Sequence, residues 1–119
     1  MPDVSFNADP DTGYVIFYTS DQTGFGQFPF WGGTSFVAPQ LNGVTMLLDQ
    51  YVGKRVGFLN PTLYHLAAAG LAYGGSKAPL AQITAGDNWY YNGSKGYNLG
   101  AGLGTLDVFN FATYLRSQP

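Results

Sequence analysis

The sequence predicts an α/β fold. A β-branched and aromatic run, Tyr-Val-Ile-Phe-Tyr at 14–18, indicates a strand, and apolar residues at helical spacing over 36–52 indicate a long helix. The aromatic content of 17% and the 17 glycines are typical of packed rings, turns and loops rather than of a simple helical bundle. Because there are no repeats and no low-complexity linker, we expect residues 1–119 to form one segment without an internal domain boundary.

The first half of the chain leads from a strand to the long helix. A turn signal at 9–13 precedes the strand at 14–18, and a second extended piece is expected at 27–31. The helix that follows is apolar nearly all round, so we expect it to be buried on several sides.

Shorter elements follow in the second half. Asn60 and Pro61 indicate the cap and first residue of a helix that runs from 62 to about 72, where Tyr-Gly-Gly ends it. Residues 74–104 are glycine-rich and irregular, with a short strand at 80–84. Thr105 is expected to cap a last amphipathic helix over 106–116.

Composition excludes several classes of function. Only 10% of the residues are charged and the net charge is −2, so no basic face exists for nucleic acid and no polybasic patch for a membrane. The absence of cysteine excludes disulfides, a thiolate nucleophile and cysteine-based zinc sites, and a single histidine excludes a histidine-rich metal site. No apolar run reaches the roughly 18 residues of a membrane span, and residues 1–4 are not a signal peptide, so a secretion signal would have to lie outside this chain.

Ser35 has two interpretations. It follows Gly32, Gly33 and Thr34 at the start of the long helix, where glycines keep the approach to a hydroxyl open. The first N–H groups of a helix have no intrahelical partner, and Pro39 is expected in that first turn, where its missing N–H has no cost. Ser35 is therefore either a nucleophile beside oxyanion-stabilising donors or only an N-cap, a position that serine favours anyway.

Five motifs lie along the chain: Pro-Asp-Val-Ser at 2–5 with Ala-Asp-Pro-Asp-Thr-Gly-Tyr at 8–14, Gly-Thr-Ser-Phe-Val-Ala-Pro at 33–39, Leu-Leu-Asp-Gln at 47–50, Gly-Phe-Leu-Asn-Pro-Thr-Leu-Tyr at 57–64, and Ile-Thr-Ala-Gly-Asp-Asn at 83–88 with Gly-Leu-Gly at 102–104. In this order they resemble the sedolisin family, the serine-carboxyl peptidases that include the kumamolisins. The resemblance implies the C-terminal portion of a subtilisin-like three-layer catalytic domain, with the helix after Ser35 at its centre. It favours Ser35 as the nucleophile, with Gly33 and Thr34 forming the turn and oxyanion region.

The resemblance also implies acids that this chain lacks. In the family a Glu acts as the base, an Asp supports it and a further Asp helps form the oxyanion hole, which makes the enzymes active in acid. All three precede the nucleophile, and this chain contains seven Asp and no Glu, none at a catalytic position. We assign these Asp residues to turns and caps and His65 to a structural or surface role. We therefore expect the isolated chain to be inactive or nearly so.

Partners and location follow from the same resemblance. It implies peptide or protein substrates for the complete enzyme and an extracellular location. Outside the complete fold the apolar helix would expose its surface, so we expect association with the upstream catalytic segment or with a second copy. Neither nucleic acid nor a membrane is an expected partner.

A calcium site is disfavoured. Sedolisins resemble one another in a C-terminal calcium site with two aspartates, one immediately before the Ile of Asp-Ile-Thr and one two residues after Gly-x-Gly. Here Gln82 precedes Ile83, and Asn98 follows Ser94 and Gly96. Because amides lack the negative charge that calcium prefers, we expect a metal-free loop held by amide hydrogen bonds of Gln82 and Asn98, and no cofactor.

Two other functions remain open. The chain could be a non-catalytic remnant that folds or pairs but does not cleave peptides. The run Asn-Trp-Tyr-Tyr-Asn-Gly at 88–93 could instead mark a glycan- or surface-binding module, although a run of rings in a glycine-rich loop is expected to pack onto its own domain.

Overall fold

A computed structural model describes residues 1–118. The chain divides into two compact units, one formed by Asn7–Gly43 and the other by Met1–Phe6 together with the residues from Val44 onward. The division falls within helix α1, after Gly43. None of the helices within the described part of the chain combines the length and the apolar character needed to cross a membrane.

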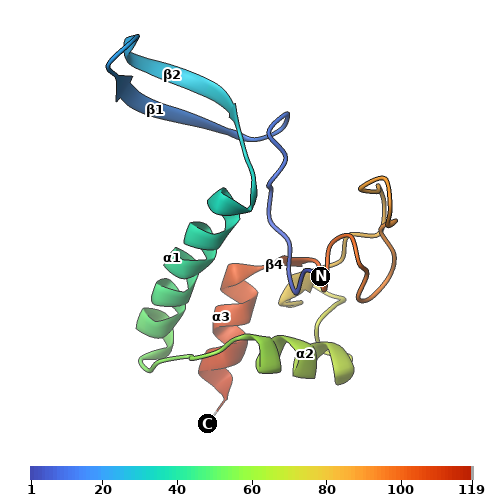
Figure 1. Cartoon of the computed structure of the whole chain (residues 1–119). Coiled ribbons are helices and arrows are strands. Elements are labelled where there is room, and N and C mark those ends of the chain that lie inside the picture. The colour runs from blue at the N-terminus through green and yellow to red at the C-terminus, as the bar shows by residue number, and fades with distance from the viewer. Residues whose placement is uncertain (119) are drawn as a thin grey trace. The chain divides into compact units, whose positions relative to one another are not determined.

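A two-stranded hairpin dominates the unit of residues 7–43 (Figure 1). Strand β1, Tyr14–Ser20, pairs antiparallel with β2, Gly24–Trp31, in a register that sets Ser20 opposite Gly24. Both predicted strands are confirmed, and each extends toward the turn that joins them. Aromatic pairs across the ladder, such as Tyr18 with Phe28 at 4.3 Å between ring centroids, stabilise the pairing.

Helix α1, Thr34–Val52, confirms the long helix predicted over 36–52 and begins two residues earlier. Within residues 1–118 most of its surface is exposed, as expected of this helix outside the complete fold. Leu48 is its one buried residue, at 1% exposure, whereas Met46 is 74% and Leu47 60% exposed. The apolar pattern therefore correctly indicates a helix, but no other described residues cover most of its surface.

The hydrophobic core lies in the unit that contains the C-terminal elements. It gathers buried side chains from the second half of α1, from α2 at Asn60–Ala68, from β3 at Leu80–Ala81, from β4 at Thr105–Leu106 and from α3 at Val108–Ser117. Its fully buried members include Leu48, Leu66, Leu103 and Phe111. The N-terminal segment joins this unit through hydrogen bonds from Ser5 N–H to the Gly104 carbonyl and from Leu103 N–H to the Asp3 carbonyl.

The ends of the shorter elements differ from the predictions. Helix α2 begins at Asn60 with Leu59 as its N-cap, so the predicted Asn60 cap is wrong, and the helix ends at Ala68 rather than near 72. Thr105 is not the cap of α3. It pairs with Ala81 in the β3–β4 ladder, and the Asp107 side chain instead accepts a hydrogen bond from Asn110 N–H at 2.9 Å. The strand predicted over 80–84 is limited to Leu80–Ala81.

Candidate active site

Ser35 is the second residue of α1, and its side chain is exposed. Its hydroxyl has no hydrogen-bond partner among residues 1–118. An N-cap serine would stand before the first helical residue and accept a bond from an N–H of the first turn. Ser35 does neither, so the N-cap interpretation is wrong and the hydroxyl is available for chemistry.

The turn before Ser35 is built by close backbone packing. Gly33 has a φ of 97° and donates its N–H to the Ala8 carbonyl at 2.6 Å. A Cβ on Gly32 would lie 2.7 Å from both the Ala8 oxygen and the Pro10 nitrogen, so no side chain fits there. The two glycines thus allow the chain to turn tightly beside residues 8–10 immediately before the helix.

Of the backbone N–H groups at 33–35, just before and at the start of α1, one forms a hydrogen bond that holds the turn and two have no partner among the described residues. The Gly33 N–H is already used by Ala8, whereas the N–H groups of Thr34 and Ser35 have no partner among residues 1–118. Free N–H groups at the positive end of a helix are suited to binding an oxyanion. Gly33 therefore holds the turn, and Thr34 and Ser35 supply the available donors.

Pro39 lies deeper in the helix than predicted. It is the sixth residue of α1, in the second turn, so the expectation that it occupies the first turn is wrong. An N–H at this position would bond to the Ser35 carbonyl, four residues earlier, and proline has none. The carbonyl of Ser35 consequently lacks the bond that a residue other than proline at position 39 would donate.

Most of the Asp carboxylates hold turns, caps and loop ends. Asp9 accepts bonds from Asp11 N–H at 3.1 Å and from the Thr12 hydroxyl at 2.9 Å, and these bonds lower its pKa. Asp49 accepts from Val56 N–H at 2.7 Å, while Asp107 caps α3. Turn and cap roles were predicted for these acids, and Asp9 and Asp107 confirm them.

His65 lies exposed on α2, as expected of a surface histidine. It borders a hollow of about 410 Å³ that Lys54, Arg55 and Tyr114 also line. The surroundings of His65 therefore include two other basic side chains.

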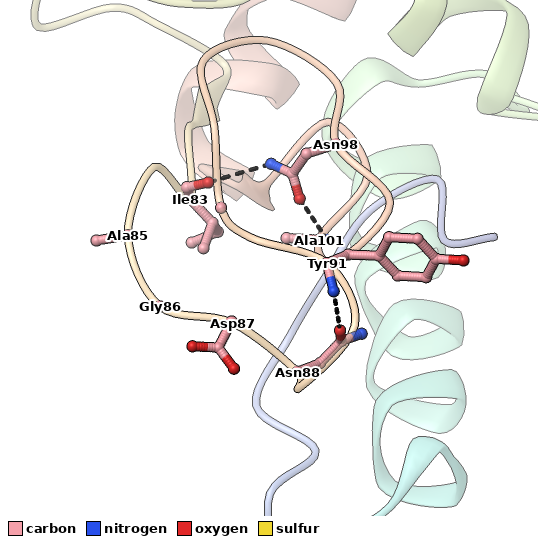
Figure 2. Close-up of a pocket in the computed structure, with 10 residues that line it drawn as sticks. Ile83, Ala85, Gly86, Asp87, Asn88, Tyr91, Asn98 and Ala101 are labelled. Carbon is pink, nitrogen blue, oxygen red and sulfur yellow. Dashed lines mark hydrogen bonds between the residues drawn. The ribbon is translucent and has the colours of Figure 1, made fainter.

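The loop of residues 82–102 brings together the residues of the degenerate calcium motif. Gln82 Oε1 accepts a bond from Gly96 N–H at 3.0 Å. Asn98 Nδ2 donates to the Ile83 carbonyl at 3.1 Å, and its Oδ1 accepts from Ala101 N–H at 2.8 Å (Figure 2). Nδ2 also donates to the Ser94 carbonyl at 3.1 Å. The amide hydrogen bonds predicted for Gln82 and Asn98 are present.

The donor set of this loop does not fit calcium. The group that Asn98 directs at the two carbonyls is an NH₂, which donates hydrogen bonds and cannot ligate a cation. Within residues 1–118, no group of three or more His, Cys, Asp or Glu side chains is arranged to hold a metal ion.

The aromatic run at 88–93, within this loop, includes two rings that project into solvent. Trp89 is 93% and Tyr90 84% exposed, so these two rings do not pack onto the described residues of this chain. The turn is made by Asp87, whose Oδ1 accepts from Trp89 N–H at 2.9 Å, and by Asn88, whose Oδ1 accepts from Tyr91 N–H at 2.8 Å. Because these side chains bond to the backbone, the turn forms without burying its rings.

Sequence reasoning missed one part of the Ser35 site, the Ala8 carbonyl. It anchors the turn through the main chain, so its side chain carries no signal for this role. The signal nearest to it is the pair Gly32-Gly33, which indicates that another backbone segment approaches closely.

Comparison with known proteins finds curated relatives and similar solved structures, and no family model matches. The chain is 37% identical over 102 residues to kumamolisin from Bacillus sp. (strain MN-32), covering 86% of this chain and 16% of kumamolisin. It is 28% identical over 122 aligned positions to sedolisin from Pseudomonas sp. (strain 101), covering 99% of this chain and 19% of that protein.

One of the similar solved structures is Pseudomonas sedolisin, a serine-carboxyl proteinase complexed with two molecules of pseudo-iodotyrostatin. It matches with a TM-score of 0.78 at 27% identity, covering 99% of this chain and 30% of that chain. This likeness confirms the predicted α/β fold class. The chain spans less than a third of the length of each of these proteins.

Proposed function

Because this chain belongs to the sedolisin family of serine-carboxyl peptidases and shares its subtilisin-like α/β fold, we propose that Ser35 is the nucleophile of an acid-acting serine endopeptidase. One observation carries the proposal. The Ser35 hydroxyl is exposed and unbonded at the start of α1, beside two N–H groups that have no partners among residues 1–118.

The proposed reaction passes through an acyl-enzyme. Ser35 Oγ attacks the carbonyl carbon of a peptide bond and loses its proton to a base, while the N–H groups of Thr34 and Ser35 stabilise the oxyanion. The proton is then delivered to the leaving amine, and water hydrolyses the ester. A carboxylate base remains able to accept a proton in acid, where a histidine would already be protonated.

We assign the base and its supporting acids to polypeptide outside these 119 residues. No Glu occurs in the chain, and Asp9, Asp49 and Asp107 are engaged in turns, a loop end and a cap. The isolated chain is therefore proposed to be inactive, and the complete protein to act on peptides outside the cell.

A chimera tests this assignment. In it, this chain replaces the matching part of Pseudomonas sedolisin, which supplies the rest of the catalytic domain. The chimera should cleave a peptide in acid and form a covalent adduct with a peptide aldehyde, and Ser35→Ala should abolish both. Thr34→Ser, which keeps the backbone donor, should retain both activities. Cleavage by the Ser35→Ala chimera would contradict the role of Ser35.

A second assay tests the isolated chain. We expect no turnover of a peptide substrate from about pH 3 to pH 8, because Ser35 lacks a base. Turnover that Ser35→Ala abolishes would show instead that a residue within this chain serves as the base.

We also propose that the chain associates with the segment that carries those acids, or with itself. The apolar residues Met46 and Leu47 of α1 are exposed, and a groove of about 540 Å³ lies where Leu47 and Tyr51 of α1 meet Val108 and Phe109 of α3. Exposed apolar surface of this kind marks interaction sites. Light scattering on the chain should show self-association that Leu47→Lys reduces, whereas a monomer at all concentrations would leave the absent segment as the sole proposed partner.

The exposed rings of Trp89 and Tyr90 favour a glycan- or surface-binding module as the second candidate. Exposed aromatic faces stack on sugars. In a Trp31→Phe background, Trp89 fluorescence reports on this turn alone. A change on adding polysaccharides would support binding, and an unchanged spectrum across a panel would exclude it.

A further inference from the structure

Asn98 is the buried polar side chain of the loop formed by residues 82–102. It is 7% exposed, and every polar atom of its side chain is engaged. Its backbone also pairs with Gly102 in both directions, at 3.0 and 2.8 Å. Asn98 therefore connects both ends of the loop.

The orientation of the Asn98 amide follows from its partners. Nδ2 faces two carbonyl oxygens, which only accept, and Oδ1 faces the Ala101 N–H, which only donates. Exchanging the nitrogen and oxygen would set an acceptor against two acceptors and a donor against a donor. The geometry thus allows one assignment, with the NH₂ group donating to the carbonyls of Ile83 and Ser94. Figure 2 shows the bond to Ile83.

Two carbonyl oxygens that converge need a partner of positive character. A metal ion supplies it in many loops, and a hydrogen-bond donor with two N–H groups supplies it here. Gln82 adds a similar link, since its Oε1 accepts the Gly96 N–H that would otherwise be unpaired within the loop.

We propose that the NH₂ group of Asn98 replaces a bound cation in this loop, so that the loop folds without metal and a carboxylate at position 98 makes its folding depend on calcium. The carboxylate introduced by Asn98→Asp would keep the bond from Ala101 but would direct a second, unprotonated oxygen at the Ile83 and Ser94 carbonyls. A buried negative charge facing two acceptors is unfavourable. Ca²⁺ ligated by these three oxygens would remove the conflict. The inference does not depend on the role of Ser35.

The matched control is Asn88, which uses its amide in the opposite way. Its Oδ1 accepts from the N–H groups of Tyr90 and Tyr91, and its side chain is exposed. Asn88→Asp keeps these acceptors and adds the same charge to the same loop. A general effect of charge would therefore appear in both variants, whereas the loss of the NH₂ donor affects only Asn98→Asp.

The test measures thermal unfolding of the chain in EDTA and in millimolar CaCl₂. Wild type and Asn88→Asp should have the same Tm in both conditions. Asn98→Asp should unfold lower in EDTA, by on the order of 5–10 °C for the loss of two buried hydrogen bonds, and CaCl₂ should restore much of the difference.

Each other outcome decides against part of the proposal. A calcium-dependent rise for wild type would show that the loop binds the ion as it stands. An Asn98→Asp variant as stable as wild type in EDTA would show that the NH₂ group is not needed. If Asn98→Asp does not fold in EDTA, folding on adding CaCl₂ supports the proposal. If Asn98→Asp folds in neither condition, the double variant Gln82→Asp/Asn98→Asp is tested with CaCl₂. Failure of the double variant to fold would show that carboxylates in this loop do not bind the cation, and the proposal would be overturned.

Discussion

Replacing Ser35 by alanine separates a free nucleophile from a structural cap through stability alone. The Ser35 hydroxyl makes no hydrogen bond with residues 1–118, so the change breaks none. Alanine is a better helix former than serine by up to about 0.7 kcal/mol. Ser35→Ala should therefore leave the free energy of unfolding unchanged or raise it by up to about 0.7 kcal/mol.

Asp107→Ala in the same chain provides the comparison with a true cap. The Asp107 carboxylate accepts a bond from Asn110 N–H at 2.9 Å at the start of α3. Removing such a cap costs about 1 kcal/mol. Urea unfolding followed by circular dichroism should give equal m values for the two variants. The free energy of unfolding of Ser35→Ala should equal or exceed that of wild type, and that of Asp107→Ala should be lower by about 1 kcal/mol.

A loss of about 1 kcal/mol or more in Ser35→Ala, matching that of Asp107→Ala, would refute the reasoning. It would mean that the hydroxyl caps the helix and is not free to react. A neutral Ser35→Ala combined with loss of aldehyde labelling in the chimera would leave the nucleophile as the remaining role.

Further predictions concern the turn before Ser35 and the N-terminal segment. Gly32→Ala should destabilise the chain by ~1–3 kcal/mol in urea unfolding, because its Cβ would lie 2.7 Å from the Ala8 oxygen. Gly43→Ala, in open space on α1, should instead stabilise it by up to about 1 kcal/mol, and a loss at Gly43 equal to that at Gly32 would contradict the close-approach argument. The hydrogen bond from the Tyr64 hydroxyl to Asp3 raises the pKa of Tyr64 from 10.0 to about 12, so its stabilising effect is complete below pH 10 and is lost as the pH rises to about 12. Because burial also raises the pKa of Tyr73, absorbance titration should show a late ionisation step that loses the amplitude of one tyrosine in Tyr64→Phe, and an unchanged amplitude would refute the assignment.

Local sequence patterns predicted the long elements well and their ends poorly. The aromatic run at 14–18 and the helical spacing over 36–52 each lie within the observed element. The caps depended on distant partners. Threonine is a common N-cap residue, but Thr105 pairs with Ala81 in a strand, and Asp107 is the N-cap of α3 instead. At α2, Leu59 is buried and precedes the helix, so packing overrides the preference for Asn60 as a cap.

Residue type alone does not predict which hydrogen bonds two of the asparagines in the loop of residues 82–102 make. Positions 88 and 98 are both asparagine and lie in the same loop, and the sequence is compatible with amide hydrogen bonding at either one. Asn88 uses its oxygen as an acceptor in an exposed turn, whereas Asn98 is buried and uses its nitrogen to hold two carbonyls. Only the positions of the Ile83 and Ser94 backbones distinguish these roles, and those positions come from the fold.

The same reasoning applies to the turn at Ser35. The motif predicts that Gly33 forms a turn. Which N–H groups remain without a partner depends, however, on the Ala8 carbonyl, 25 residues earlier in the sequence. Because Ala8 takes the Gly33 N–H at 2.6 Å, the donors proposed for the oxyanion are the N–H groups of Thr34 and Ser35, which lie in the first turn of α1. A donor set built on a helix start requires little reorganisation when charge develops. The glycine turn is therefore proposed to position the donors and Ser35, while the Gly33 N–H itself is used by Ala8.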